Sequence, residues 1–219
     1  VNKGFALRML KKEEDALACF VEAEKCREFS TSPVAGDISL QLGRLYSARG
    51  QYEQAVRVLE KMKARNSERP GYLLYSLLGE AYAATGKNKK AISVLQKAIR
   101  FNPHDARSLS ILGRLYGVEG QGDDIALALC TQAVNIDDLS WENWYRLAKI
   151  RYRMADYDGA HAAVRESLLR NRKAVDAIFL AGTLYMAQGK RKQAAKMFQK
   201  VLRTAPDYPG ASRALQQSV

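Results

Sequence analysis

The chain has 219 residues, of which 47% are hydrophobic and 26% are charged, a composition typical of soluble globular proteins. Its formal net charge of +12 favours an anionic partner, such as an acidic peptide, a nucleic acid or a membrane surface, without choosing among them. No run of about 18 apolar residues is present, which excludes a transmembrane helix.

The N-terminal stretch VNKGFALRMLKKEEDAL begins inside an amphipathic pattern, and it lacks both an initiator methionine and the apolar run of a signal peptide. We therefore expect a fragment of a longer protein, which could have lost a targeting signal, and we expect a cytoplasmic location. The cysteines Cys19, Cys26 and Cys130 form no CxxC pair, and the two histidines lie far apart in the sequence. The sequence therefore predicts no metal site, no disulfide framework and no cofactor.

A small residue opens each of six similar segments, which recur every 34 to 39 residues. These residues are Gly4, Gly43, Gly79, Gly113, Ala148 and Gly182. The word LGRLY occurs at 42–46 and again at 112–116, with the variant LGEAY at 78–82. An alanine follows each small residue after twelve or thirteen positions, and further apolar or small residues follow it four and seven positions later. Because this spacing has the helical period, each segment is predicted to hold two helices.

Glycines mark the turn between the two helices in four of the segments. They are Gly50, Gly86, Gly120 and Gly189. Pro103 and Pro206 are expected to follow the ends of two second helices. The stretches STSPVAGD (30–37) and NSERPG (66–71) predict lengthened turns between segments.

The small residue lets the two helices of a hairpin approach closely, so we expect Gly43 to face Ala55. Tyrosines three residues after the glycine, such as Tyr46 and Tyr82, are expected to fill the gap between helices. One hairpin alone cannot bury its apolar face, and the hairpins must therefore stack.

The segment from Tyr72 and the last segment match the repeated pattern at the most positions. In the segment from Tyr72 these residues are Leu78, Gly79, Tyr82, Gly86, Ala91, Leu95, Ala98 and Pro103. In the last segment they are Gly182, Tyr185, Gly189, Ala194, Phe198, Val201 and Pro206. This pattern resembles the tetratricopeptide repeat. The segment from Trp141 supplies the tryptophan of that family as Trp144, but it has Ala148 for the glycine and Arg151 for the tyrosine.

The resemblance covers nearly the whole chain and implies an all-α fold. The expected architecture is a right-handed superhelix, or α-solenoid, of antiparallel helical hairpins with a concave groove lined by the first helices. The implied organisation is a single array over 1–219, with units at about 1–35 (partial), 36–71, 72–105, 106–140, 141–174 and 175–208, and with a further or capping helix starting within 209–219.

In the family that the chain resembles, the residue after the small one, and its neighbours at helical spacing, point into the groove. The groove candidates are Arg44, Glu80, Arg107, Arg114, Tyr145, Lys149, Tyr152 and Arg153. Tyr145, Lys149 and Tyr152 are spaced i, i+4, i+7 and so share one helix face. We predict a basic patch flanked by tyrosines, because arginine presents a fork suited to carboxylates. The alternative is that these charges merely solvate a helix face.

A second basic region lies towards the C-terminus. It comprises Arg170, Arg172, Lys173, Lys190, Arg191, Lys192, Lys196 and Lys200. We interpret it as a source of solubility and as the end of the array, with contact to anionic lipid or nucleic acid as the alternative.

The sequence holds no Walker loop, no GxSxG motif and no recognisable pair of nucleophile and base, so we predict no enzyme. The predicted function is a scaffold that binds a protein or peptide, including acidic peptides, in its groove. A regulatory or targeting module of a larger enzyme or signalling protein is the alternative. RNA binding is disfavoured, because the reading positions vary among Arg, Glu, Lys and Thr rather than repeating a polar pair. The sequence assigns no oligomeric state.

Overall fold

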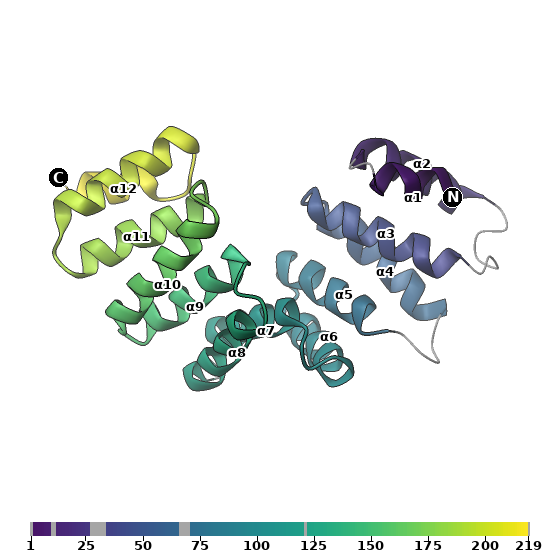
Figure 1. Ribbon diagram of the computed structural model, residues 1–219, viewed down its shortest axis with the longest axis horizontal. Helices are drawn as coiled ribbons and strands as arrows, with labels where there is room; N and C mark the ends of the chain where they lie inside the picture. Colours follow the sequence, from purple (N-terminus) through teal and green to yellow (C-terminus); the bar gives the residue numbers. More distant parts are fainter. Residues whose placement is uncertain (1, 10–11, 27–33, 66–70, 121, 219) are drawn as a thin grey trace. The chain divides into compact units, whose positions relative to one another are not determined.

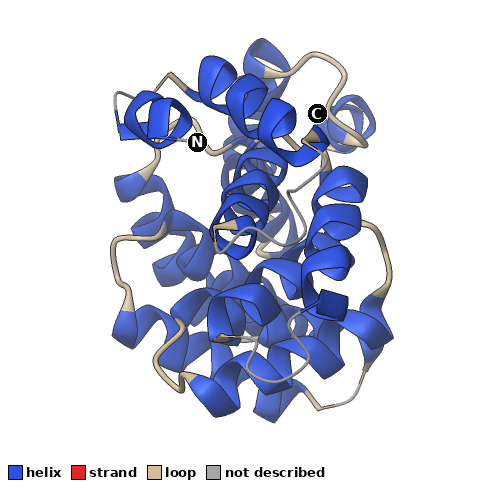
Figure 2. Ribbon diagram, turned by 90° about the vertical axis from the view of Figure 1, so that its right-hand side faces the viewer, coloured by secondary structure: helices blue, strands red, loops and turns tan. Residues whose placement is uncertain are grey.

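The computed structural model of the protein describes residues 2–9, 12–26, 34–65, 71–120 and 122–218. Every regular element within these ranges is a helix, and no strand occurs among them (Figure 2). The predicted all-α fold is therefore confirmed. Of the two lengthened turns, the residues 30–33 and 66–70 lie outside the described residues.

The chain divides into two compact units, Val1–Pro103 and His104–Val219. The first unit contains α1 (Asn2–Met9), α2 (Glu13–Lys25), α3 (Ala35–Ala48), α4 (Tyr52–Arg65), α5 (Tyr72–Ala84) and α6 (Asn88–Phe101). The second contains α7 (Ala106–Glu119), α8 (Asp123–Ile136), α9 (Trp141–Arg153), α10 (Tyr157–Arg170), α11 (Val175–Ala187), α12 (Arg191–Thr204) and α13 (Ala211–Gln217). Consecutive helices pair as hairpins, from α1 with α2 to α11 with α12 (Figure 1). The last helix, α13, packs on α12.

The turn inside a hairpin ends the first helix with a left-handed residue. Gly86 has a φ of 73°, and the amide of Lys87 after it donates a hydrogen bond of 2.9 Å to the carbonyl oxygen of Tyr82. This bond caps the last carbonyls of the helix. In the fifth hairpin the same place is taken by Ala155, with a φ of 59°. A Cβ in this conformation costs about 1–2 kcal/mol, so this turn is formed against a local preference.

In four of the hairpins, those of Gly4, Gly43, Gly79 and Gly182, the small residue is covered by a large side chain of the second helix. A Cβ placed on Gly43 would lie 2.6 Å from Cδ2 of Leu59, and one on Gly79 would lie 2.4 Å from Leu95. The atoms nearest to Gly43 thus belong to Leu59 rather than to the expected partner Ala55, which is fully buried one turn earlier. The reason is that helical side chains lean towards the N-terminus of their own helix, and Leu59 therefore reaches back over that turn.

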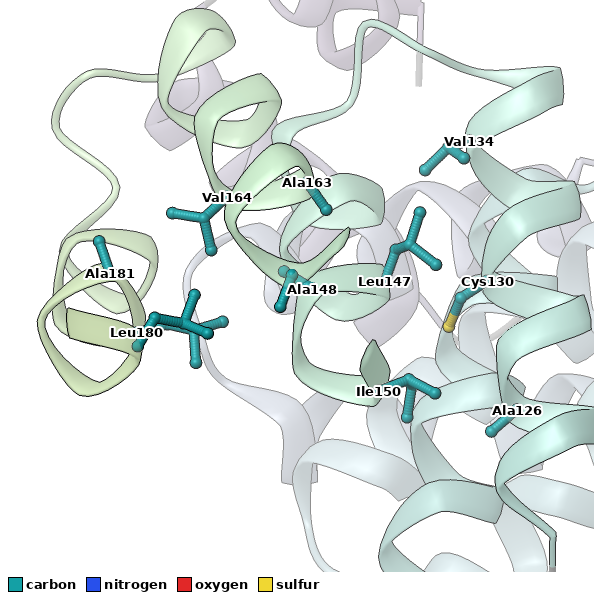
Figure 3. Close-up of a cluster of buried hydrophobic side chains, with 12 residues drawn as sticks. Ala126, Cys130, Val134, Leu147, Ala148, Ile150, Ala163, Val164, Leu180 and Ala181 are labelled. Atoms are coloured by element: carbon teal, nitrogen blue, oxygen red, sulfur yellow. The ribbon is translucent and has the colours of Figure 1, made fainter. Parts of the chain in front are cut away.

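The core of the second unit is assembled from α8, α9, α10 and α11 (Figure 3). Leu147, Ala148 and Ile150 lie on one side of α9 and are at most 3% exposed. Cys130 of α8 is fully buried among them, and this burial raises the pKa of its thiol to about 12. Cys130 therefore acts as a small apolar core residue. Because these residues of α9 pack into the core, the side chains on the other side of this helix are available for other contacts.

Candidate functional site

The candidate site lies on α7 and α9, the first helices of two successive hairpins in the second unit. Gly117 brings these helices close together, because a Cβ at this position would lie 2.6 Å from Cδ1 of Ile150. Near this contact, Arg114 projects from α7, and Arg146 and Lys149 project from α9. We call these three residues the cationic cluster.

The three positive charges of the cationic cluster have no paired carboxylate. Arg114, Arg146 and Lys149 take part in none of the ion pairs found among the described residues. The two arginines are half-buried. Nη1 of Arg146 donates a hydrogen bond of 3.0 Å to Oγ of Ser110, a neutral partner on α7. Partly buried charges without counter-ions are unfavourable, and this favours the entry of an anion.

The pKa values of the cluster reflect burial and the closeness of its positive charges. Burial lowers the pKa of Arg146, and the positive charge of Arg114 lowers it further. Burial and then Arg114 likewise lower the pKa of Lys149, whereas Asp176 raises it. Both burial and the neighbouring positive charge disfavour the charged form of the group. A bound anion would act in the opposite direction and stabilise all three charges together.

Tyr145 forms an aromatic border to the cluster. Nζ of Lys149 lies 5.8 Å from the centroid of its ring, within the range of a cation–π contact. Burial, followed by the negative charge of Asp176, raises the pKa of Tyr145 to about 12, so the phenol stays protonated at neutral pH. Asp176 of α11 in turn accepts a hydrogen bond of 2.6 Å from the hydroxyl of Tyr208.

The other predicted residues of the second unit are distributed around this centre. Arg107 is exposed on the first turn of α7, and its charge contributes to the lowered pKa of Arg146. Arg153 forms an ion pair of 2.9 Å with Asp123 at the start of α8, and its charge is therefore compensated. The ring of Tyr152 lies 5.9 Å from the ring of Tyr157, near the turn between α9 and α10.

The two remaining candidates belong to the first unit. Arg44 is exposed on α3, and Glu80 is half-buried on α5. Within the second unit, the structure thus gathers Arg107, Arg114, Tyr145 and Lys149 around one centre.

Arg146 is a central member of the site that the sequence reasoning missed. Steps of four and seven residues from Tyr145 give the predicted groove positions Lys149 and Tyr152, and they pass over the neighbouring Arg146. Arg146 lies three residues before Lys149 and seven before Arg153, so all three share one helix face. A search for basic residues at these spacings would have found it.

In the described part of the chain, no helix combines the length and the apolar run that crossing a bilayer requires. Within the same residues, no three His, Cys, Asp or Glu side chains come together in a group that could hold a metal ion.

Comparison with curated proteins gives no match. Among solved structures, the APC/C hetero-tetramer Cut9–Hcn1 matches with a TM-score of 0.84 and 18% identity over 99% of this chain. This chain spans 41% of the length of that one. TTC0263, a tetratricopeptide repeat protein of Thermus thermophilus, matches with a TM-score of 0.69 and 16% identity over 84% of this chain and 98% of its own.

YrrB, described as a tetratricopeptide repeat protein with an unusual peptide-binding site, matches with a TM-score of 0.58 and 20% identity over 90% of this chain and 97% of its own. At these identities the likeness establishes the fold alone. The family model of the tetratricopeptide repeat matches residues 40–106 and 145–209, more than half of the sequence. The chain therefore belongs to the tetratricopeptide repeat family.

Proposed function

We propose that this protein is a non-catalytic interaction scaffold that binds an acidic peptide or protein segment across α7 and α9. The observation that carries this proposal is the cationic cluster, in which three neighbouring cations have no paired carboxylate among the described residues. A segment with Asp or Glu side chains would supply the missing negative charge.

The chemistry of the cluster suits carboxylates. An arginine guanidinium forms paired hydrogen bonds to a carboxylate in a fixed plane, and lysine adds a compact charge beside it. Hydrogen bonds to charged groups contribute about 1.5–3 kcal/mol each, more than those between neutral groups. Tyr145 adds a flat apolar surface that loses little side-chain entropy when it is covered. Together these groups favour a short acidic segment that also carries apolar atoms.

This proposal also accommodates a role as a regulatory or targeting module. The chain spans 41% of the length of the Cut9–Hcn1 chain that it resembles. In a larger protein, the same surface would bring an acidic partner to a neighbouring domain. The binding step is the same in both cases, and one experiment tests it.

The test is fluorescence anisotropy with a labelled peptide of about ten residues rich in Asp and Glu, compared with a peptide in which Asn and Gln replace the acids. We expect the acidic peptide to bind more tightly, and we expect R114E combined with K149E to weaken it about tenfold or more. The matched control is K87E with K89E, which makes the same change in net charge at exposed positions near the start of α6.

Equal weakening by both pairs of substitutions would show non-specific attraction and contradict the proposal. A second arm replaces the peptide with single-stranded RNA at low and near-physiological salt. Tight and sequence-selective retention at the higher salt would favour RNA reading instead, because non-specific phosphate binding is lost as salt rises.

A further inference from the structure

A cavity of about 610 Å³ lies between α10, α11 and α12 of the second unit. Its lining includes Ala162, Arg165 and Leu169 of α10, Ala181 and Tyr185 of α11, and Met197 of α12. This volume falls within the range of sites that enclose a ligand or several large side chains. The cavity contains none of the residues of the cationic cluster, and the inference drawn from it goes beyond the proposed function.

One face of α10 forms a wall of the cavity. Asp158, Ala162, Arg165 and Leu169 all line it and follow one another at intervals of four, three and four residues. Residues at this spacing lie in one row along a helix. Leu169 is 62% exposed, and Ala162, about two turns earlier in the same row, is also exposed. This row is therefore a helix face without a partner within the described part of the second unit.

Leu169 is unusual among the repeats. Every second helix has a buried alanine at the same place in its repeat, and in α10 this residue is Ala160. Leu169 lies nine residues after it. In the other five helices that position holds Lys25, Ala64, Arg100, Asn135 and Arg203. Hairpin packing therefore does not demand a large apolar side chain here. Exposing a leucine gives up the free energy of burying its apolar surface, which a partner would recover by covering it.

Arg165 is matched in the lining of the cavity by Asp158, and the excess of positive charge, which we call the basic rim, lies on the adjoining helix α12. This helix, which supplies Met197, carries five basic residues and no acidic one. Lys200 follows Met197 by three residues and so shares its helix face. His161 also lines the cavity, and the positive charge of Lys190 lies close enough to lower the pKa of this imidazole. Asp158 is the one carboxylate in the lining of the cavity.

We propose that this cavity docks an acidic amphipathic helix of a partner protein, which inserts large apolar side chains between α10 and α12. The space between two neighbouring helices suits a third helix, whose anchors at i, i+3 or i+4, and i+7 share one face. Leu169 and Met197 would contact these anchors, and the small side chain of Ala162 leaves room for one of them. The basic rim would pair with acidic residues on the flanks of the docked helix.

The test uses the complete chain and a fluorescein-labelled helical peptide of about 16 residues, long enough for about four turns. The peptide carries Leu and Phe at i, i+3, i+4 and i+7 and Glu at its flanking positions. We expect saturable binding in fluorescence anisotropy, and we expect L169R to weaken it about tenfold. L169R should keep the fold, because α6 and α12 carry arginine at the same place, as Arg100 and Arg203. Circular dichroism checks this.

Two comparisons make the result specific. The control variant is L139R, which alters a leucine of the same unit that is 78% exposed and lies outside the cavity, and it should leave the affinity unchanged. A peptide with the same apolar face and Lys in place of Glu should bind at least about tenfold more weakly, because its charge repels the rim.

Three results would overturn the inference. The first is equal binding by the protein before and after the L169R substitution, and the second is equal binding of the Lys peptide. The third comes from sedimentation with vesicles containing about 30% phosphatidylserine, which represent an anionic membrane surface. If vesicle binding requires Leu169 while the acidic helix does not bind, the surface serves a membrane and not a partner helix.

Discussion

Nη1 of Arg146 lies 3.0 Å from Oγ of Ser110 and donates a hydrogen bond that joins α9 to α7. Ser110 is fully buried, so the bond lies at the protected end of a half-buried arginine. We expect Ser110→Ala to lower the free energy of unfolding by about 1–3 kcal/mol, because one guanidinium N–H then loses its partner away from water. Urea unfolding followed by circular dichroism measures this.

The matched control for this bond is Ser93→Ala, which removes a hydroxyl from an exposed position of α6 and should change stability by less than about 0.5 kcal/mol. Replacing both members, as Ser110→Ala with Arg146→Met, should recover part of the loss, since no donor is then left unsatisfied. An unchanged free energy of unfolding after Ser110→Ala would contradict the role given to the bond.

The contact between Gly79 and Leu95 predicts a cost for any added side chain. A Cβ on Gly79 would lie 2.4 Å from Cδ2 of Leu95, well inside van der Waals contact. We expect Gly79→Ala to destabilise the protein by about 1–3 kcal/mol through overpacking. Thermal unfolding gives the measurement. Gly71→Ala is the control, because nothing lies within 4 Å of a Cβ at that position and its φ is negative.

Shortening the opposing side chain provides a second check of this contact. Leu95→Ala alone should destabilise the core by leaving a cavity. In combination with Gly79→Ala, the two losses should sum to less than their separate values, because the new methyl group enters the space that leucine has vacated. Strict additivity would show that the two residues do not oppose each other.

The sequence predicted the small residues at the contact between the two helices of a hairpin and the glycines in the turns. The recurrence of small residues such as Gly79, and of glycines such as Gly86 in the turns, follows from close helix approach and from left-handed φ angles, and both leave a residue-type signature. The periodic pattern did not identify which side chain covers the small residue. That depends on the lean of Leu59 along its helix, which spacing alone does not express.

The candidate site was only partly predictable. Arg114 and Lys149 were found because they follow the small residue of their segments, a position fixed by the repeat. Arg146 was passed over because the counting started from Tyr145, but its proximity to Arg114 depends on how α7 and α9 pack together, through the contact of Gly117 with Ile150. A cluster formed by two helices requires their relative placement, and no single repeat contains that information.

Ala155 offers a stabilising substitution. It adopts a φ of 59° at the turn of the fifth hairpin, where Gly50, Gly86 and Gly189 occupy the corresponding turns with φ values of 71°, 73° and 72°. We expect Ala155→Gly to raise the free energy of unfolding by up to about 1 kcal/mol, since removal of the Cβ relieves strain that exceeds the added entropy of the unfolded chain. Chemical denaturation measures the change.

The comparison for this turn is Ala187→Gly, at an exposed position within the last turn of α11, where glycine should lower stability by roughly 0.5–1 kcal/mol. Opposite signs for the two substitutions would isolate the effect of the left-handed conformation. A loss of stability in Ala155→Gly would show that the alanine is not strained.

His161 gives the protein a specific pH dependence. Burial lowers the pKa of its imidazole, and the charge of Lys190 lowers it further, against the opposing effects of Gln188 and Asp158. As the pH falls through about 6.5, the unfolded chain binds a proton at this residue more readily than the folded protein does, so the free energy of unfolding decreases. We expect His161→Gln to reduce this loss between about pH 7.5 and pH 5.5, a window above the titration of ordinary carboxyls. Urea midpoints at both values provide the measurement, and His104→Gln, at an exposed position, is the control. An identical pH dependence with and without His161 would show that its imidazole titrates alike in the folded and unfolded protein.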